Sequence, residues 1–190
     1  MAFEDLLGAL DKLEIKFLVG GSVASGTHAF PRPTQDIDVI ADIGTDRIDS
    51  FCEALAPNFY VDAITARQSV TTGRAFNIIH SRYAFKFDIF PVGNSAFIQA
   101  EIGRALCVRS RVQGPEGIEF PVASPEGIIL GKLDWYRGGA ETSERQWNDI
   151  LDVIQVCRAS LDLAYLDHWA TELRVADLLA VALAQPHRQR

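Results

Sequence analysis

The chain has 190 residues, of which 48% are hydrophobic and 23% charged, so it can bury a core and its composition excludes a disordered protein. A net charge of −7 and a sequence pI near 5.0 argue against a broad cationic face, and so against an extended DNA-binding surface. A local basic surface is still compatible with this net charge, because basic residues are concentrated in the middle of the sequence. Solvated surface charge explains them equally well. They are Arg67, Arg74, Arg82, Lys86, Arg104, Arg109, Arg111 and Lys132.

Cysteine usage and the N-terminal segment point to a reducing compartment. Cys52, Cys107 and Cys157 are far apart and form no CxxC pair, which indicates neither a disulfide framework nor a zinc site. Residues 1–13 are acidic and amphipathic and lack the features of a signal peptide. No apolar run approaches the roughly 18 residues that span a bilayer. We therefore expect a cytoplasmic protein with no membrane partner.

Hydrophobic spacing predicts alternating helices and strands in the first half of the chain. Helical spacing recurs in three segments, and we expect helices over residues 1–13, 48–56 and 62–72. Apolar or alternating runs predict strands at residues 16–19, 37–40, 59–61, 75–79 and 84–90. The last two strands are joined by a short polar turn, which predicts a hairpin. These elements indicate an α/β (α+β) protein with a mixed β-sheet flanked by helices.

The last third of the sequence is predicted to be helical. A Ser-Pro-Glu sequence at residues 124–126 supplies a cap, a first-turn proline and an acid, and a helix beginning there should end at the glycine pair 138–139. From Glu144 onward, apolar spacing predicts three further helices. We therefore expect an α/β core over residues 1–123 and a C-terminal helical section over residues 124–190. The tryptophans of this section have core spacing and should pack: Trp135, Trp147 and Trp169.

A glycine turn follows the first predicted strand. Gly20 and Gly21 break that strand, and Ser22 is a suitable N-cap for a short helix over residues 23–28. Glycines let the backbone approach a ligand closely, and the N-terminal end of a helix attracts phosphate. A Gly-Gly pair alone indicates only a turn. Together with the acid motif that follows it, this segment predicts a phosphate cradle.

Three aspartates complete the motif. Asp36 and Asp38 lie two apart in a predicted strand, so both side chains point to one face. Asp88 occupies a polar position of FKFDIF, whose apolar residues would face the core. If the two strands are neighbours, the carboxylates converge, and their repulsion is relieved by a divalent cation such as Mg²⁺ or Mn²⁺. A third carboxylate lets a second metal bind or a hydroxyl nucleophile be activated. The pattern predicts metal-assisted phosphoryl transfer.

The order of these motifs resembles the DNA polymerase beta-like nucleotidyltransferase superfamily. The resemblance implies a nucleotidyltransferase fold with a nucleoside triphosphate, such as ATP, as substrate. It implies that Asp36 and Asp38 bind the metal and the nucleotide phosphates. Asp88 would complete the metal site and help to activate the acceptor. The segment that would hold the triphosphate corresponds to Gly20, Gly21 and Ser22.

The C-terminal half also resembles a narrower group. The segments SPEGIILGKLDWYRGG and SERQWNDILDVI are similar to small bacterial nucleotidyltransferase-like proteins related to the toxin and antitoxin groups of abortive-infection systems. This resemblance covers roughly residues 4–185. The group's helix lysine and downstream Arg-x-x-x-Asp correspond to Lys132, Arg145 and Asp149. Lys132 would neutralise the triphosphate as a point charge. An ordinary i,i+4 ion pair between Arg145 and Asp149 is an equal interpretation.

The loop before the first two aspartates offers two further candidates. Arg32 and Thr34 lie in it, and a loop that must pass the acids is suited to phosphate or base contacts. His28, just after the glycine turn, is a weaker candidate, because a lone histidine at a helix end is more often a cap or surface residue. We therefore add Arg32 and Thr34, together with Lys132, to the nucleotide-binding residues.

Taken together, the residues and the resemblance predict a Mg²⁺-dependent nucleotidyltransferase. It would move a nucleoside monophosphate to an acceptor hydroxyl on a protein or RNA, with a toxin–antitoxin system as one setting. An alternative keeps the fold without turnover, as a nucleotide-binding or antitoxin-like protein that engages a partner encoded nearby. Another is a toxin that modifies transfer RNA, which the acidity of the chain disfavours. Three mutually repelling carboxylates favour the enzyme, since a binding module has no need of them.

Overall fold

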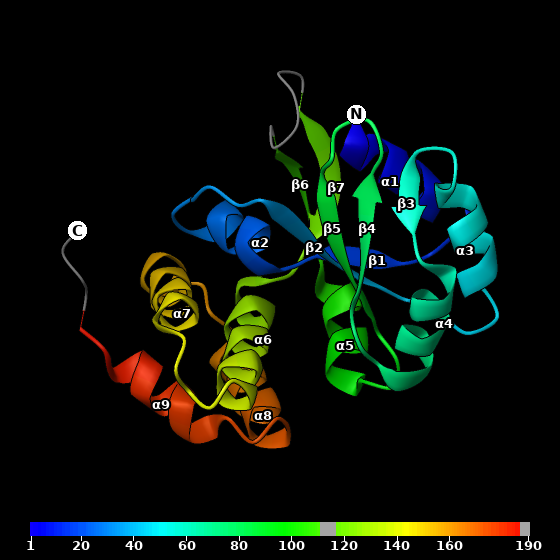
Figure 1. Cartoon of the computed structure of the whole chain (residues 1–190). Coiled ribbons are helices and arrows are strands. Elements are labelled where there is room, and N and C mark those ends of the chain that lie inside the picture. Colours follow the sequence, from blue (N-terminus) through cyan, green and yellow to red (C-terminus); the bar gives the residue numbers. More distant parts are fainter. Residues whose placement is uncertain (111–116, 187–190) are drawn as a thin grey trace. The chain divides into compact units, whose positions relative to one another are not determined.

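The computed structural model describes residues 1–110 and 117–186 of the chain (Figure 1). The chain forms two compact units. The sheet unit comprises Met1–Gly20 and Pro33–Val122, and the helical unit comprises Gly21–Arg32 and Ala123–Arg190. The sequence-based division at residue 123 assigns Gly21–Arg32 to the α/β core, whereas this segment groups with the C-terminal helices.

The sheet unit is built on a mixed sheet, which has seven strands within the described residues, in the order β3-β4-β5-β2-β1-β7-β6. The strands are β1 (Phe17–Val19), β2 (Asp36–Ala41), β3 (Phe59–Val61), β4 (Phe76–His80), β5 (Lys86–Pro91), β6 (Leu106–Ser110) and β7 (Ile118–Val122). β1 pairs antiparallel with β2 and parallel with β7. β4 and β5 form the predicted hairpin, and β5 pairs parallel with β2. The β2–β5 pairing is the one that positions the candidate site.

Four helices described in the sheet unit flank the sheet (Figure 1): α1 (Ala2–Lys12), α3 (Ile48–Leu55), α4 (Ala63–Thr72) and α5 (Ala96–Arg104). Phe3 of α1 lies with its ring centroid 5.9 Å from that of Phe87 on β5 and 4.9 Å from that of Phe120 on β7. All three rings are almost completely buried, and burying each stabilises the fold by about 1.5–3 kcal/mol. This packing commits the Phe87 side of β5 to the core and leaves the other side for polar residues.

The helical unit consists of α2 (Gly21–His28), α6 (Pro125–Gly138), α7 (Glu144–Cys157), α8 (Leu163–Glu172) and α9 (Ala176–Ala184). Ser124 is the predicted N-cap of α6, and its Oγ accepts a hydrogen bond from Gly127 N at 3.0 Å. α2 packs against α6 and α7, and His28 at its end has Nε2 2.9 Å from the Ala123 carbonyl oxygen. None of the described helices has the length and apolar character needed to cross a membrane.

The observed elements confirm most of the predicted ones, and the differences concern three unpredicted elements, the N-cap of α2 and the packing of one tryptophan. α5, β6 and β7 were not predicted, and for β7 one reason is Pro121, which weakens a strand pattern. α2 begins at Gly21, so Ser22 lies inside the helix and the predicted N-cap role is wrong. Trp135 is 63% exposed, so its predicted packing role is wrong as well.

Candidate active site

The three predicted aspartates lie on two adjacent strands. β2 and β5 run parallel, with Asp38 directly opposite Asp88 and Asp36 opposite Lys86. The intervening residues Ile37 and Phe87 are completely buried. Because side chains alternate along a strand, the three carboxylates share the face that points away from this apolar core. The neighbouring strands required by the sequence argument are therefore present.

Lys86 is a further charged side chain on this face, and the sequence analysis gave it no role there. Its Nζ lies 2.8 Å from Asp88 Oδ2 and 3.2 Å from Asp36 Oδ2. The hydrogen bond to Asp88, reinforced by the one to Asp36, raises the pKa of Lys86 above its ordinary value. The signal that could have revealed it is its spacing of two residues from Asp88, which places both on one face. We call Asp36, Asp38, Asp88 and Lys86 the acid cluster.

Thr34 holds the first carboxylate of the cluster. Its Oγ1 lies 3.0 Å from Asp36 Oδ1 and 3.1 Å from the Asp36 carbonyl oxygen, both of which can accept the hydroxyl proton. A side chain that bonds two residues ahead is a common way for threonine to order a loop entering a strand. Thr34 therefore orients Asp36, and its predicted contact with nucleotide stays a prediction.

The glycine turn is hydrogen-bonded to β2, the strand that carries Asp36 and Asp38. Gly20 N donates to the Asp38 carbonyl oxygen at 2.9 Å, and a Cβ on Gly20 would lie only 2.6 Å from Ile40 Cδ1. Gly21 follows with φ at +54°, a conformation that favours glycine. The amide groups of the first turn of any helix lack intrahelical partners, so the start of α2 can offer them to an anion.

Ser22, Arg32 and Lys132 meet in the helical unit around one carboxylate, that of Asp149. Arg32 donates through Nη2 to Asp149 Oδ2 at 3.0 Å and also to Ser22 Oγ. Lys132 Nζ lies 2.9 Å from the same Oδ2 and 2.8 Å from Gln146 Oε1. We call Arg32, Lys132 and Asp149 the Asp149 cluster. The partners of Asp149 come from distant parts of the chain, while Arg145 is exposed on the same helix as Asp149.

Lys132 and Asp149 of the Asp149 cluster are buried, Arg32 is partly exposed, and the three residues together comprise two cations and one carboxylate. The side chains of Lys132 and Asp149 are only 8% and 10% exposed. Burial by itself would raise the pKa of Asp149, but the hydrogen bonds and charges of Arg32 and Lys132 outweigh it and hold that pKa below its ordinary value. Asp149 is therefore ionised at neutral pH and compensates one of the two cations.

The acid cluster has the chemistry of a divalent-cation site. As the side chains lie here, no His, Cys, Asp or Glu group of three among the described residues could hold a metal ion. Mg²⁺ does not need such a cage, because it usually binds one or two carboxylates and takes its other ligands from water and substrate phosphates. Carboxylate oxygens on one partly exposed face fit that requirement. The assignment of the ion to Asp36, Asp38 and Asp88 stays a prediction from the sequence.

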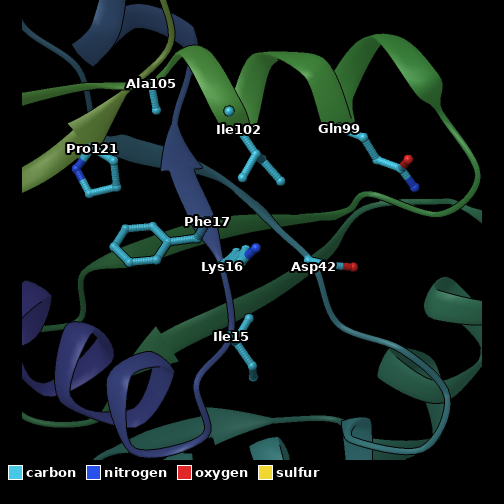
Figure 2. Close-up of a pocket in the computed structure, with 9 residues that line it drawn as sticks. Ile15, Lys16, Phe17, Asp42, Gln99, Ile102, Ala105 and Pro121 are labelled. Carbon is cyan, nitrogen blue, oxygen red and sulfur yellow. The ribbon is translucent and has the colours of Figure 1, made fainter.

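A cavity of about 590 Å³ lies in the sheet unit (Figure 2), and Asp36, Asp38 and Asp88 are not among the residues that line it. Phe17, Ile102 and Pro121 supply apolar walls, and the lining also includes the exposed charged residues Lys16 and Asp42. Asp42 follows the end of β2 opposite to Asp36, about 13 Å along the chain from Asp38 at the usual rise of a strand. The cavity is therefore separate from the acid cluster.

Comparison with known proteins shows the fold. No protein-family model matches the chain, and no curated protein matches it with significance. The structure of ANT(2'')-Ia in complex with adenylyl-2''-tobramycin is similar, with a TM-score of 0.52 and 15% identity over 91% of this chain and 95% of that one. A solution structure of the antibiotic-resistance factor ANT(2'')-Ia has a TM-score of 0.50 and 17% identity over 94% and 92%.

A third similar structure is an antigenic nucleotidyltransferase-like protein from Paracoccidioides brasiliensis. It has a TM-score of 0.50 and 17% identity over 94% of this chain and 89% of that one. The three matches span nearly the whole chain at low identity. The chain therefore has the nucleotidyltransferase fold.

Proposed function

We propose that this protein is a nucleotidyltransferase that moves a nucleoside monophosphate from a nucleoside triphosphate to an acceptor hydroxyl. The observation that carries the proposal is the parallel register of β2 and β5, which sets Asp38 opposite Asp88 with Asp36 on the same face. Carboxylates assembled in this way on a nucleotidyltransferase fold have a clear use in phosphoryl transfer. The fold and the acid geometry support the proposal independently of each other.

The reaction is a displacement at the α-phosphorus. The acceptor oxygen forms a bond to that phosphorus, the bond from it to the α,β-bridging oxygen breaks, and pyrophosphate leaves. The acceptor hydroxyl proton passes to a carboxylate, for which Asp88 is the candidate because it is the third acid beyond the Asp-x-Asp pair. A bound Mg²⁺ or Mn²⁺ supplies the positive charge that lets phosphate oxygens approach the carboxylates.

Each remaining predicted residue has a role in this proposal. The backbone at Gly20 and Gly21 and the hydroxyl of Ser22 receive phosphate oxygens at the start of α2. Arg32 and Lys132 are assigned positive charge toward the triphosphate, as the sequence analysis predicts for them. Thr34 holds Asp36 in orientation. Catalysis of this kind consists mostly of positioning and charge neutralisation.

A thermal-shift experiment tests the nucleotide and metal site. The wild-type protein is melted in chelator, in Mg²⁺ alone, in ATP with chelator, and in ATP with Mg²⁺. We expect the largest rise in Tm with both, since a ligand at a hundred times its Kd stabilises the folded state by about 2.7 kcal/mol. Asp38→Asn should lose most of that rise. An equal ATP shift with and without Mg²⁺ would remove the metal role of Asp36 and Asp38.

Transfer itself is tested by incubating the protein with each of the four α-labelled nucleoside triphosphates. The acceptor arms are bulk transfer RNA, the product of the neighbouring reading frame, and tobramycin, which the bound ligand of ANT(2'')-Ia suggests. We expect pyrophosphate release and labelling of one acceptor class by wild type but not by Asp38→Asn. Nucleotide binding without labelling of any arm would support the alternative of a catalytically silent binding or antitoxin-like protein.

A further inference from the structure

Lys86 interacts with the acid cluster closely enough to act as a built-in cation. It begins β5 opposite Asp36 and lies two residues before Asp88, so its side chain emerges on the acid face. Its Nζ is within 2.8 Å of Asp88 Oδ2 and 3.2 Å of Asp36 Oδ2. The ammonium group therefore bonds oxygens that the proposed function assigns to a metal ion. A cation in contact with them opposes the binding of another cation.

The charge of the cluster depends on this residue. Within the four residues of the acid cluster, three carboxylates and one ammonium sum to two negative charges before nucleotide binds, which a single divalent ion neutralises. The charge of a bound triphosphate adds equally to wild type and to a Lys86 variant, so the difference between them remains. Without Lys86 three negative charges would remain, and a single divalent ion would leave one uncompensated. Like charges this close raise the free energy of the folded state unless they are neutralised. The number of divalent ions that the cluster accepts should therefore change with this one side chain.

The side chain is also suited to being displaced. Lys86, Asp36 and Asp88 are 37%, 36% and 17% exposed, so water can replace the ammonium at the carboxylates and the ammonium can return to solvent. Lysine is a compact point charge on a flexible stem, unlike the rigid fork of arginine. This contrasts with Lys132, which is 8% exposed and is held by two partners.

We propose that Lys86 neutralises part of the acid cluster in the metal-free protein and restricts the cluster to one divalent cation when nucleotide is bound. This inference rests on the proposed function, since it assigns the metal to the same carboxylates. Lys86 is on this account a positioning residue: it sets the cation requirement of the site and orients Asp36 and Asp88 until the metal and triphosphate arrive together.

The test counts Mn²⁺ ions by electron paramagnetic resonance titration and checks the affinities by calorimetry. Without nucleotide, Lys86→Met should bind Mn²⁺ at least ten times more tightly than wild type. With a non-hydrolysable ATP analogue, wild type should bind one ion per chain and Lys86→Met two. Lys86→Arg, which keeps the charge, should return the count to one. Equal affinity and equal counts in wild type and Lys86→Met would overturn the proposal.

Two controls make the result specific. Lys16→Met removes an exposed lysine at the opposite end of the β1–β2 pair, next to Asp42, and should bind Mn²⁺ as wild type does. Lys86→Gln keeps a polar side chain and should behave as Lys86→Met does, which separates charge from folding. Thermal melts in saturating Mn²⁺ establish that each variant is folded. A gain in affinity in Lys16→Met as large as that in Lys86→Met would also overturn the proposal.

Failure of this inference can be told apart from failure of the proposed function. Asp38→Asn is introduced into wild type and into Lys86→Met, and Mn²⁺ binding is measured again. Loss of binding in both backgrounds, combined with the predicted gain in Lys86→Met alone, supports both proposals. Loss in both backgrounds without that gain removes only the role of Lys86. Undiminished Mn²⁺ binding in both Asp38→Asn proteins would remove the metal site itself and the Lys86 proposal with it.

Discussion

The two charged clusters of this protein carry excess charge of opposite sign. The acid cluster of the sheet unit combines three carboxylates with the ammonium of Lys86. The Asp149 cluster of the helical unit combines two cations, Arg32 and Lys132, with one carboxylate. The first is partly exposed and the second largely buried. An unmatched charge costs more where water is excluded, so the buried cluster depends more strongly on its internal partner.

This difference separates stability from function. In the Asp149 cluster the single carboxylate compensates Lys132, which is largely shielded from water, and Arg32, which is partly exposed. Removing that carboxylate should therefore lower the free energy of unfolding. In the acid cluster the carboxylates repel one another, and removing one relieves the metal-free protein while damaging ligand binding. The same substitution of Asp by Asn should therefore have opposite consequences in the two places.

The largest effect is expected for Asp149→Asn. Breaking a buried ion pair by removing one partner costs about 3–5 kcal/mol, because the other charge is left uncompensated. The free energy of unfolding is measured by urea titration at neutral pH. Asp177→Asn is the matched control, since Asp177 pairs with Arg137 but is 69% exposed and should change stability by only about 0–1 kcal/mol. Equal losses in the two variants would break the comparison.

The pH dependence of the stability difference between wild type and Asp149→Asn gives an independent check of the role of Asp149. Burial raises the pKa of Asp149, but Arg32 and Lys132 lower it by more than burial raises it. The folded-state pKa of Asp149 therefore lies below the unfolded value of about 3.9. A depressed pKa contributes stability that is fully present above the unfolded pKa and is lost as pH falls through the folded one. The stability gap between wild type and Asp149→Asn should be constant from about pH 7 to 5 and shrink only below about pH 4.

A gap that has already disappeared near pH 6 would contradict this assignment. It would mean that Asp149 is protonated in the folded protein at that pH and does not compensate the two cations. The measurement is a series of urea titrations of both proteins in buffers of equal ionic strength.

The glycine that begins the helical unit should have a smaller effect. Gly21 has φ at +54°, a conformation that costs other residues about 1–2 kcal/mol, so Gly21→Ala should lower stability by that amount. Gly8→Ala is the control with the opposite sign: Gly8 lies within α1, a Cβ there meets no other atom within 4 Å, and alanine should stabilise by about 0.5–1 kcal/mol. Thermal melts of the two variants and of wild type distinguish backbone strain at Gly21 from a general effect of replacing glycine by alanine.

The smallest effect on stability is expected for Asp38→Asn in chelator. Relief of repulsion should leave the metal-free protein as stable as wild type or more stable by up to about 1 kcal/mol. Asp62→Ala is a useful reference, because that carboxylate caps α4 by accepting from Ile64 N and Thr65 N and its loss should cost about 1 kcal/mol. A loss in Asp38→Asn as large as in Asp62→Ala would assign Asp38 a structural role instead.

Local patterns predicted the elements where burial alternates or repeats regularly. The helix period of α1 and the strand period of β2 and β5 are visible in the residues themselves, because each depends only on neighbours along the chain. The sequence analysis did not predict α5, β6 and β7. In β7, Pro121 weakens the strand pattern. The grouping of Gly21–Arg32 with the C-terminal helices was likewise not predictable from composition.

Sequence alone determined that Asp36 and Asp38 share a face, because the side-chain period of a strand is two. It also indicated the face of Asp88, because Phe87 on one side of it must be buried. Only the tertiary structure decided that β5 lies parallel to β2 with Asp38 opposite Asp88, and that Lys86 therefore reaches two carboxylates. It likewise decided the partner of Asp149, since Arg32 is 117 residues away. Strand register and ion pairs between distant residues depend on how the core packs, which no local pattern specifies.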